Sequence, residues 1–456
     1  MEEKVKGNPL RTLPVKKLLV QFAVPSIIAM LVGSLYNIVD QLFIGRSVGQ
    51  FGNAATNISF PLSISCVALA LLFGIGGASA FNLAMGAGKK EQASYYIGNA
   101  ATMMFLCGLV LCIVTELFLT PLLKFFGSTP NILGHAQTYT RITAIGFPFL
   151  IFATGGGHLI RADGSPRFTM ISNMAGAVVN TILDAVFVFG LNLGMAGAAY
   201  ATVIGQIVSF ILVVSYMRNY KTVSLGKEQF RPRKEYIGKV ASLGAAPFSN
   251  QMAMMVVQIV MNNSLAHYGR LSNYGADIPI AVVGIISKVN MVFFSFIIGI
   301  SQGLQPIVSF NYGAGQYQRV KQAYKTAISV GFVLSIIAFG LFQLFPENII
   351  ALFGKESESK EYVNFAVDYF RIFLFFTFLN FIQPITSNFF TAIGKPKRGM
   401  LLSLTRQIIF LLPLLVVLPI FMKMDGILYA GPAADFMAGM VGIAMIVFEF
   451  KGKEYR

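Results

Sequence analysis

The stretch Val178-Val179-Asn180-Thr181-Ile182-Leu183-Asp184-Ala185-Val186-Phe187 lies inside an apolar run from about Phe168 to Gly190. A run of this length is long enough to cross a bilayer as a helix. A carboxylate in such a helix costs about 3 kcal/mol by insertion scales, so it should face the protein rather than lipid. Asn180 and Asp184 are four residues apart and therefore share one helix face. The pair predicts an ion or proton site, with a structural polar clamp between helices as the alternative.

The composition is that of a polytopic membrane protein. Hydrophobic residues make up 55% of the 456 residues and charged residues only 12%, about half the charge density of a soluble protein. The formal net charge of +16 would suggest nucleic acid in a soluble protein, but here basic residues are expected in cytoplasmic loops. No nucleic-acid partner is therefore expected. The three cysteines have no metal-ligand spacing and are expected to be buried small hydrophobes: Cys66, Cys107 and Cys112.

Apolar segments long enough to span a membrane recur along the whole chain. They lie near 17–43, 55–82, 94–115, 135–157, 167–190 and 195–217, and then near 240–266, 279–307, 322–345, 363–390, 399–422 and 427–449. The sequence therefore predicts an all-α polytopic membrane protein with twelve transmembrane helices. Several segments exceed the ~20 residues that a span requires, so we expect tilted or kinked helices.

The basic residues predict the orientation of these helices. With the N-terminus inside the cell, 25 Lys and Arg residues fall in cytoplasmic segments and 6 on the opposite side. The cytoplasmic set includes Arg161 and Arg167, between the fourth and fifth spans. Lys and Arg concentrate in cytoplasmic loops, so this bias predicts that both termini are cytoplasmic. Residues 1–17 are expected to be a cytoplasmic tail rather than a signal peptide.

Four short matches recur in the same order along the chain. They pair Gly86–Lys90 with Gly313–Tyr317, Lys124–Gly127 with Ala351–Gly354, Thr138–Ile142 with Asp368–Ile372, and Gly164–Arg167 with Gly394–Lys397. They predict two six-helix lobes that insert in the same orientation, because six is even. We expect an N-terminal lobe over 1–225, a basic cytoplasmic linker over 226–239 and a C-terminal lobe over 240–456. Parallel repeats of this kind enclose a binding cavity near the bilayer midplane.

Further polar residues share the predicted depth of Asp184. Tyr36, Asn37 and Asp40 can face one side of the first span, and Asp40 lies near the outer end of that span. Two residues near the outer ends of the fourth and sixth spans complete the set: Tyr139 and Thr202. Such oxygens could bind Na⁺, or two carboxyls could share a proton. For Asp40, a solvated helix-end acid is the alternative interpretation.

Candidate substrate contacts are soft or aromatic residues. The chain has 20 Met and 42 Phe, and such surfaces suit promiscuous binding, although ordinary packing explains most of them. Lys288, in the eighth span, either lines the cavity or extends to the membrane interface. Arg141 and Arg371 occupy equivalent repeat positions and are expected to anchor outer helix ends. The predicted substrate-contacting set is Tyr36, Asn37, Phe147, Phe152, Met174, Met255, Met291 and Lys288.

The whole chain resembles the multidrug and toxic compound extrusion (MATE) transporter family, in its bacterial DinF-like and MepA-like branch. The resemblance rests on Tyr36-Asn37-Ile38-Val39-Asp40-Gln41-Leu42-Phe43-Ile44-Gly45, Gly86-Ala87-Gly88, Arg161-Ala162-Asp163-Gly164-Ser165-Pro166, and Asn180 with Asp184. It implies a V-shaped pair of lobes around a central cavity, in a bacterial inner membrane. It also implies that Asp40, Asn180, Asp184, Thr202 and Tyr139 form a cation-coupling site. The first four of these would be the ligands if the coupling ion is Na⁺.

The resemblance implies a secondary active multidrug exporter that exchanges amphipathic, mostly cationic compounds for H⁺ or Na⁺. We expect a monomer in the lipid bilayer that is not an enzyme and uses no other cofactor. Another branch of the family has acids in the seventh and tenth spans, but Ala246–Met252 and Phe378–Pro384 have none. The alternative is a lipid-linked oligosaccharide flippase of the same superfamily. Its cavity should be strongly cationic, whereas Lys288 is the one central lysine here.

Overall fold

The computed structural model describes residues 9–128, 130–275, 277–351, 360–452 and 455. The spans of the N-terminal lobe are α3 (Val15–Ser47), α4 (Gln50–Gly86), α5 (Lys90–Leu117), α7 (Pro130–Ala162), α8 (Pro166–Asp184) with the π-helix η1 (Ala185–Gly190), and α9 (Gly194–Arg218). Two short helices, α2 (Pro9–Thr12) and α6 (Leu119–Phe125), precede α3 and α7. The six spans predicted for this half are thus confirmed as helices.

The C-terminal lobe has the same plan but more interruptions. Its first three spans are α10 (Lys234–Arg270), α11 (Asp277–Gly313) and α12 (Tyr317–Leu344), followed by the short α13 (Pro346–Ala351). The fourth span is divided into α14 (Lys360–Asp368), η2 (Tyr369–Phe373), η3 (Phe375–Leu379) and α15 (Ile382–Ala392). The fifth is α16 (Pro396–Leu404), η4 (Thr405–Leu411) and α17 (Leu412–Met422), and the last is α18 (Met424–Phe450).

Eleven of these helices, within the described residues, have the length and apolar composition of a membrane span. The remaining predicted span corresponds to α10, which is 37 residues long. Its hydropathy is lowered by a group of amides: Asn250, Gln251, Gln258, Asn262 and Asn263. All twelve predicted spans are therefore present as helices. Of α10, α11 and α12, α10 is the least hydrophobic on average.

The duplication is visible in the helix boundaries. The pairs α4 and α11, and α5 and α12, begin 227 residues apart, whereas α7 and α14, α8 and α16, and α9 and α18 begin 230 apart. Turn glycines at equivalent positions share a left-handed conformation, with φ of 78° at Gly88 and 71° at Gly315. The predicted internal repeat is therefore confirmed. The part of one sequence match in 352–354 lies outside the described residues, as do Lys4, Lys6, Lys355, Lys453 and Arg456 from the charge tally.

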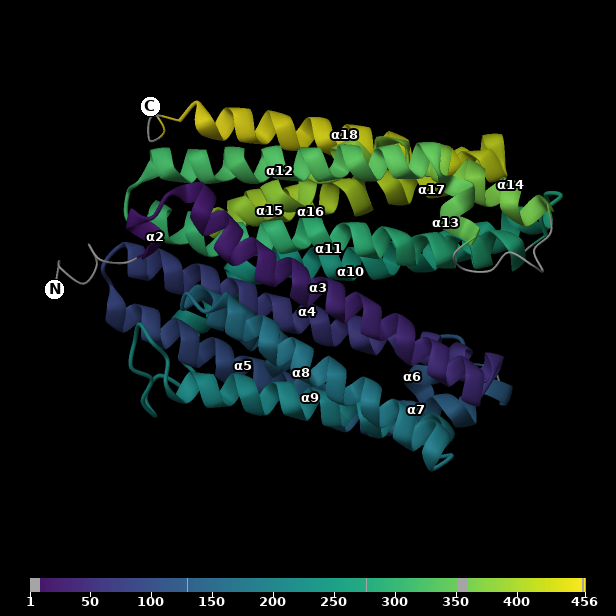
Figure 1. Cartoon of the computed structure of the whole chain (residues 1–456), viewed down its shortest axis with the longest axis horizontal. Helices are drawn as coiled ribbons and strands as arrows, with labels where there is room; N and C mark the ends of the chain where they lie inside the picture. Colours follow the sequence, from purple (N-terminus) through teal and green to yellow (C-terminus); the bar gives the residue numbers. More distant parts are fainter. Residues whose placement is uncertain (1–8, 129, 276, 352–359, 453–454, 456) are drawn as a thin grey trace.

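The two lobes meet at the end of the molecule that carries both termini, which we call the inner end (Figure 1). There α4 packs on α10 and α3 packs on α11 through glycines. A Cβ atom on Gly244 would lie 1.7 Å from the backbone oxygen of Leu72, and one on Gly76 would lie 2.1 Å from that of Val240. Farther out the lobes diverge, which confirms the V shape (Figure 1).

The connection between the lobes runs from Asn219 to Arg233 and is folded against the N-terminal lobe. Asp163 accepts hydrogen bonds from the backbone N–H groups of Lys221 and Thr222, at 2.8 and 3.0 Å. The backbone N–H of Arg233 donates to Asn99 Oδ1 at 2.7 Å. Residues 234–239, which we predicted as linker, instead form the first turns of α10.

The glycine packing predicts an asymmetry between two substitutions in α10. Gly244→Ala should lower the thermal unfolding temperature of the detergent-purified protein by several degrees. The added Cβ collides with backbone, and such overpacking costs about 1–3 kcal/mol.

Gly238→Ala is the matched control, because a Cβ there meets no atom within 4 Å and alanine favours the helix by about 1 kcal/mol. An unfolding temperature for Gly244→Ala at or above that of Gly238→Ala would contradict the close contact.

Candidate functional site

Four helices of the N-terminal lobe bring the predicted polar residues into contact. Asp40 lies on α3 and Asp184 at the last position of α8, with exposed fractions of 9% and 0%. Their carboxyl groups interact directly with one another. Tyr139 on α7 lies near Thr202 on α9 and near both carboxyls. The common depth expected from the sequence is therefore a real cluster in space.

Asn180 joins the carboxyls to α9. Of its two amide orientations, one satisfies both polar atoms: the nitrogen donates to Asp184 Oδ2 at 3.3 Å, and the oxygen accepts from the backbone N–H of Thr202 at 3.1 Å. The amide thereby fixes Asp184 through a single donor. Asn180 is itself 3% exposed, so this contact is shielded from water.

Two carboxyl oxygens in this cluster lack hydrogen-bond partners. Asp40 Oδ1 and Asp184 Oδ1 are both buried and unpaired among the described residues. Buried polar atoms almost always have a partner, and an unsatisfied one costs about 1–3 kcal/mol or more when charged. The donor set is two carboxylates, an amide oxygen and a hydroxyl, which suits either a shared proton or an oxygen-ligated cation.

The helix that carries Asp184 changes its geometry at that residue. The α-helix ends at Asp184, and a π-helix continues from Ala185 to Gly190. π-Turns inside α-helices are rare and concentrate at functional sites. This feature has no clear signature in the sequence, and we did not predict it.

An apolar layer covers the outer side of the cluster. Ile44 follows Asp40 by one turn, Val188 follows Asp184 by four residues, and Ala198 precedes Thr202 by one turn. All three belong to a separate hydrophobic cluster at the outer end of the lobe, with which Tyr139 also packs. The carboxyls are therefore screened from the outer surface by about one helical turn of side chains.

A cavity of about 200 Å³ lies on the other side of the cluster, entirely within the N-terminal lobe. Tyr36, Asn180 and Thr202 line it, whereas Asp40 and Asp184 lie behind these residues. A molecule in the cavity would thus touch the residues that hold the carboxyls. Its other walls come from α3, α7, α8 and α9.

Two charged or titratable residues at the far end of this cavity were missed. His158 and Arg161 both line it, and each is 2% exposed. An Arg161 Nη2–H donates to His158 Nδ1 at 2.9 Å. The prediction that Arg161 lies in a cytoplasmic loop is wrong, because α7 continues to Ala162 and buries it. Its place after an apolar run, three residues from a histidine, was the available signal.

The other predicted substrate contacts lie elsewhere in this conformation. Phe147 and Phe152 are buried in the core, and the Asn37 amide donates to the Gly33 carbonyl at 2.7 Å. Met174 is half-buried outside the cavity lining. Met255, Met291 and Lys288 lie in the C-terminal lobe, outside the lining of its cavity too. Of the eight predicted residues, Tyr36 lines the N-lobe cavity, and the roles of all eight stay predictions.

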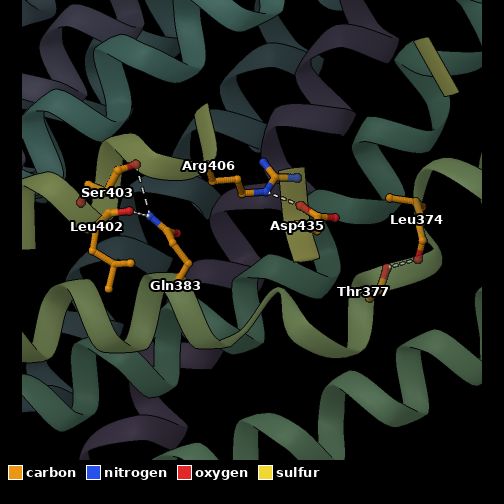
Figure 2. A network of polar contacts seen from close by, with 7 residues as sticks. All are labelled: Leu374, Thr377, Gln383, Leu402, Ser403, Arg406 and Asp435. Carbon is orange, nitrogen blue, oxygen red and sulfur yellow. Dashed lines mark hydrogen bonds and ion pairs between the residues drawn. The ribbon is translucent and has the colours of Figure 1, made fainter. Parts of the chain in front are cut away.

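The C-terminal lobe has a cavity of about 130 Å³, lined by Met254, Met261 and Tyr369 among others. Arg406 of η4 also lines it, and its Nε donates to Asp435 Oδ1 on α18 at 2.6 Å. Figure 2 shows these two side chains pointing toward one another. Their side chains are 16% and 1% exposed, so the charges are paired away from water. We did not predict this pair.

The two lobes differ at this repeat position. Arg406 and Asp435 correspond, at the 230-residue offset of these spans, to Gly176 and Gly205. In the N-terminal lobe, a Cβ on Gly176 would lie 2.7 Å from the Gly205 oxygen. Conversely, Asp184 and Asn180 correspond to Leu414 and Phe410. At these two described positions the C-terminal lobe therefore has apolar side chains in place of the acid and the amide.

A family model and several known proteins resemble this chain over most of its length. Residues 25–186 and 248–417 match the MatE family model, once in each half. The Multidrug export protein MepA of Staphylococcus aureus (strain MSSA476) is 23% identical over 435 residues, covering 95% of this chain and 94% of that protein. The solved structure of the MATE multidrug transporter DinF-BH is 32% identical, with a TM-score of 0.89 over 97% of both chains. An outward-facing multidrug resistance MATE family transporter is 22% identical, with a TM-score of 0.89 over 98% of this chain and 97% of that one.

The buried pair of the C-terminal lobe predicts strong non-additivity. Asp435→Asn should destabilise the detergent-purified protein by about 3–5 kcal/mol, because it leaves the Arg406 charge buried without its partner. The double variant Arg406→Met/Asp435→Leu should recover most of this loss, since no buried charge remains. Thermal unfolding of the two variants and the wild type is the measurement. A double variant that is less stable than Asp435→Asn would contradict the prediction.

Proposed function

This chain belongs to the MatE family of membrane transporters, and from that premise we propose that it exports amphipathic, mostly cationic organic compounds in exchange for H⁺ or Na⁺. As a member of this family it is a transporter and not an enzyme. The single observation that carries the proposal is the buried pair Asp40 and Asp184, with an unpaired oxygen on each, beside the N-lobe cavity. Its relatives include multidrug exporters, which supports the substrate class.

The unpaired carboxyl oxygens supply the reason for coupling. Two adjacent buried carboxylates repel each other and are poorly solvated, so the cluster is most stable when it holds a cation. A proton would be shared between Asp40 and Asp184. A Na⁺ ion would be held by the same carboxylates and the hydroxyl of Thr202, with the Asn180 amide turned over so that its oxygen rather than its nitrogen faces Asp184.

Asn180 and Thr202 connect this cation to the substrate. Both line the cavity, and Asn180 also donates to Asp184. A bound drug that displaces or reorients these groups changes the affinity of the carboxyls for the cation. The reverse effect has the same magnitude, because linkage between two binding sites is reciprocal. Exchange follows if the cation and the drug favour different conformations of the lobes.

The flippase alternative is less well supported. A site for a pyrophosphate-linked lipid needs several cations. Lys288 lines neither cavity and Arg406 is neutralised by Asp435, which leaves Arg161 as a single unpaired cation in the lining of the N-lobe cavity. The similarity to multidrug exporters also does not favour it. We therefore propose drug export as the function and the chain's own monomer as the working unit.

We propose that the inner end, with both termini, faces the cytoplasm of a bacterial cell. The basic bias of the sequence supports this orientation. The connection 219–233 lies at that end, and its residues Lys221, Lys227 and Arg231 are exposed.

Asp184→Asn should abolish coupling while preserving the fold. The amide keeps the shape and hydrogen bonding of the acid but removes the titratable charge. Reconstituted protein should therefore export drug at least about tenfold more slowly under an imposed H⁺ or Na⁺ gradient. The control is Asp425→Asn, which removes an exposed acid from the first turn of α18. Wild-type, gradient-driven transport by purified Asp184→Asn protein would falsify the coupling role, and imposing the two gradients separately identifies the ion.

A thiol-labelling experiment tests the orientation. In a background where Cys66, Cys107 and Cys112 are replaced by serine, Lys227→Cys should resist a membrane-impermeant maleimide added to intact cells. Lys124→Cys, at the exposed end of α6, should react with the same reagent. Labelling of Lys227→Cys from outside, with Lys124→Cys protected, would reverse the proposed topology.

A further inference from the structure

Arg161 is a buried cation without a counter-ion. Its side chain is 2% exposed and lines the N-lobe cavity. Its Nε–H has no hydrogen-bond partner, and Nη2 donates to the neutral ring nitrogen of His158. Across the described residues, no carboxylate lies within ion-pair distance of this guanidinium. A buried charge is normally paired, so this arrangement lacks an anion.

The nearest acid in the sequence is already fully used. Asp163 Oδ2 accepts from the Tyr216 hydroxyl at 2.8 Å and the Lys221 N–H at 2.8 Å, and Oδ1 accepts from the N–H and hydroxyl of Thr222 at 3.0 and 2.6 Å. Its four hydrogen bonds tie the connection between lobes to the turn after α7. Asp163 therefore holds that turn and does not neutralise Arg161.

The carbonyl groups at the end of α7 are occupied as well. The Arg161 carbonyl accepts from the Gly164 N–H at 2.9 Å, and the Leu159 carbonyl accepts from the Tyr220 hydroxyl at 2.7 Å. Neither carbonyl accepts a hydrogen bond from the guanidinium among the contacts of the described residues. In the other lobe, by contrast, the buried charge of Arg406 is neutralised by Asp435.

His158 adds a second donor beside Arg161. A guanidinium only donates, so His158 Nδ1 must be the acceptor of their 2.9 Å hydrogen bond. The ring proton of neutral His158 is therefore on Nε2. Arg161 and His158 together present N–H donors and one positive charge to the cavity, the combination that binds carboxylate and phosphate oxygens.

We propose that Arg161 and His158 bind the anionic oxygen group of a ligand at the inner end of the N-lobe cavity. The chemical class is a zwitterionic amphiphile, with a carboxylate or phosphate at Arg161 and its apolar and cationic parts toward Asn180. This inference rests on the proposed export function, which it extends from organic cations to zwitterions.

The cavity separates the two charges in space. Thr169 donates to the Gly157 carbonyl at 3.0 Å, one turn before Arg161 on α7, and it lines the inner part of the cavity. Asn180 lies eleven residues farther along α8, which is about 16 Å of helix. The cavity therefore has a positive inner end and an outer end that adjoins the carboxyl pair.

A matched pair of dyes tests the anion site. One is a rhodamine ethyl ester, which is a cation, and the other is the free acid obtained by hydrolysing it, which is a zwitterion with the same ring system. Fluorescence anisotropy with purified protein gives both dissociation constants. Arg161→Gln should weaken binding of the free acid at least about tenfold and change binding of the ester less than about twofold, because a charge-assisted hydrogen bond is lost only for the acid.

Two further variants keep the test decisive. Arg167→Gln removes an exposed arginine nearby and should leave both constants unchanged. Arg161→Lys keeps the charge but loses the forked donors, and should weaken the acid by an intermediate factor. It serves in place of Arg161→Gln if that protein fails to fold. An acid-to-ester affinity ratio that is the same in wild type and both Arg161 variants would overturn the proposal.

A competition experiment identifies the source of the anion. Displacement of the acid by dihexanoyl phosphatidylglycerol in wild type but not in Arg161→Gln supports the site with a lipid phosphate as occupant. Failure of the lipid to compete, with the tenfold effect intact, supports the site with a substrate carboxylate as occupant. Gradient-driven efflux of the ester is measured separately. If efflux is normal but the acid-to-ester affinity ratio does not change in the Arg161 variants, only the anion site is overturned. If efflux is absent but the affinity ratio changes as expected, only the export function is overturned.

Discussion

The architecture depends on the contact of backbone with backbone at the inner ends of the lobes. Gly76 and Gly244 let α4 and α10 approach so closely that a methyl group would strike a carbonyl oxygen. Interfaces between membrane helices are built in this way because lipid gives no hydrophobic drive for association, and close van der Waals packing replaces it. The hydroxyl contact between Ser34 and Ser295, at 2.9 Å, lies farther out along the same seam. Since these contacts run from the inner ends to about the middle of the helices, the outer parts of the lobes are free to diverge.

Within the N-terminal lobe, the order of layers along the helices gives the site its properties. An apolar layer with Ile44 and Val188 is outermost, the carboxyl pair lies one turn inward, and the cavity follows, ending at Arg161. Each layer draws on several helices, so no single span contains the site. Asp40 Oδ1 and Asp184 Oδ1 have no hydrogen-bond partner among the described residues, so the cation or proton that we propose would supply the partner that both oxygens lack.

Much of this could be predicted from the sequence, and the failures have physical causes. Hydropathy and repeat spacing predicted the twelve helices and the duplication, because the bilayer imposes length and polarity on every span. Helical periodicity placed Asn180 and Asp184 on one face, and the direction and rise of the spans placed Asp40 at a similar depth; the structure brings the three together. Arg161 was missed because a basic residue after an apolar run resembles a loop residue until the helix end is known. Arg406 and Asp435 are 29 residues apart on different helices, so their pairing depends on tertiary packing that periodicity does not report.

The two halves of this duplicated chain differ most clearly at one pair of positions. The N-terminal lobe has Gly176 and Gly205 there, and the C-terminal lobe has Arg406 and Asp435. A lone arginine at the first position of the tight half would meet a neighbouring backbone, and a lone acid would be stranded without a partner. In the other half the two charges occur together, and the arginine lies within a π-helical segment. The two halves therefore differ at these positions in helix geometry and in both side chains. The repeat is therefore preserved in the helix boundaries but not in the buried charges. A protein assembled from two copies of the N-terminal half would have two carboxyl clusters, and one assembled from two C-terminal halves would have two buried Arg–Asp pairs.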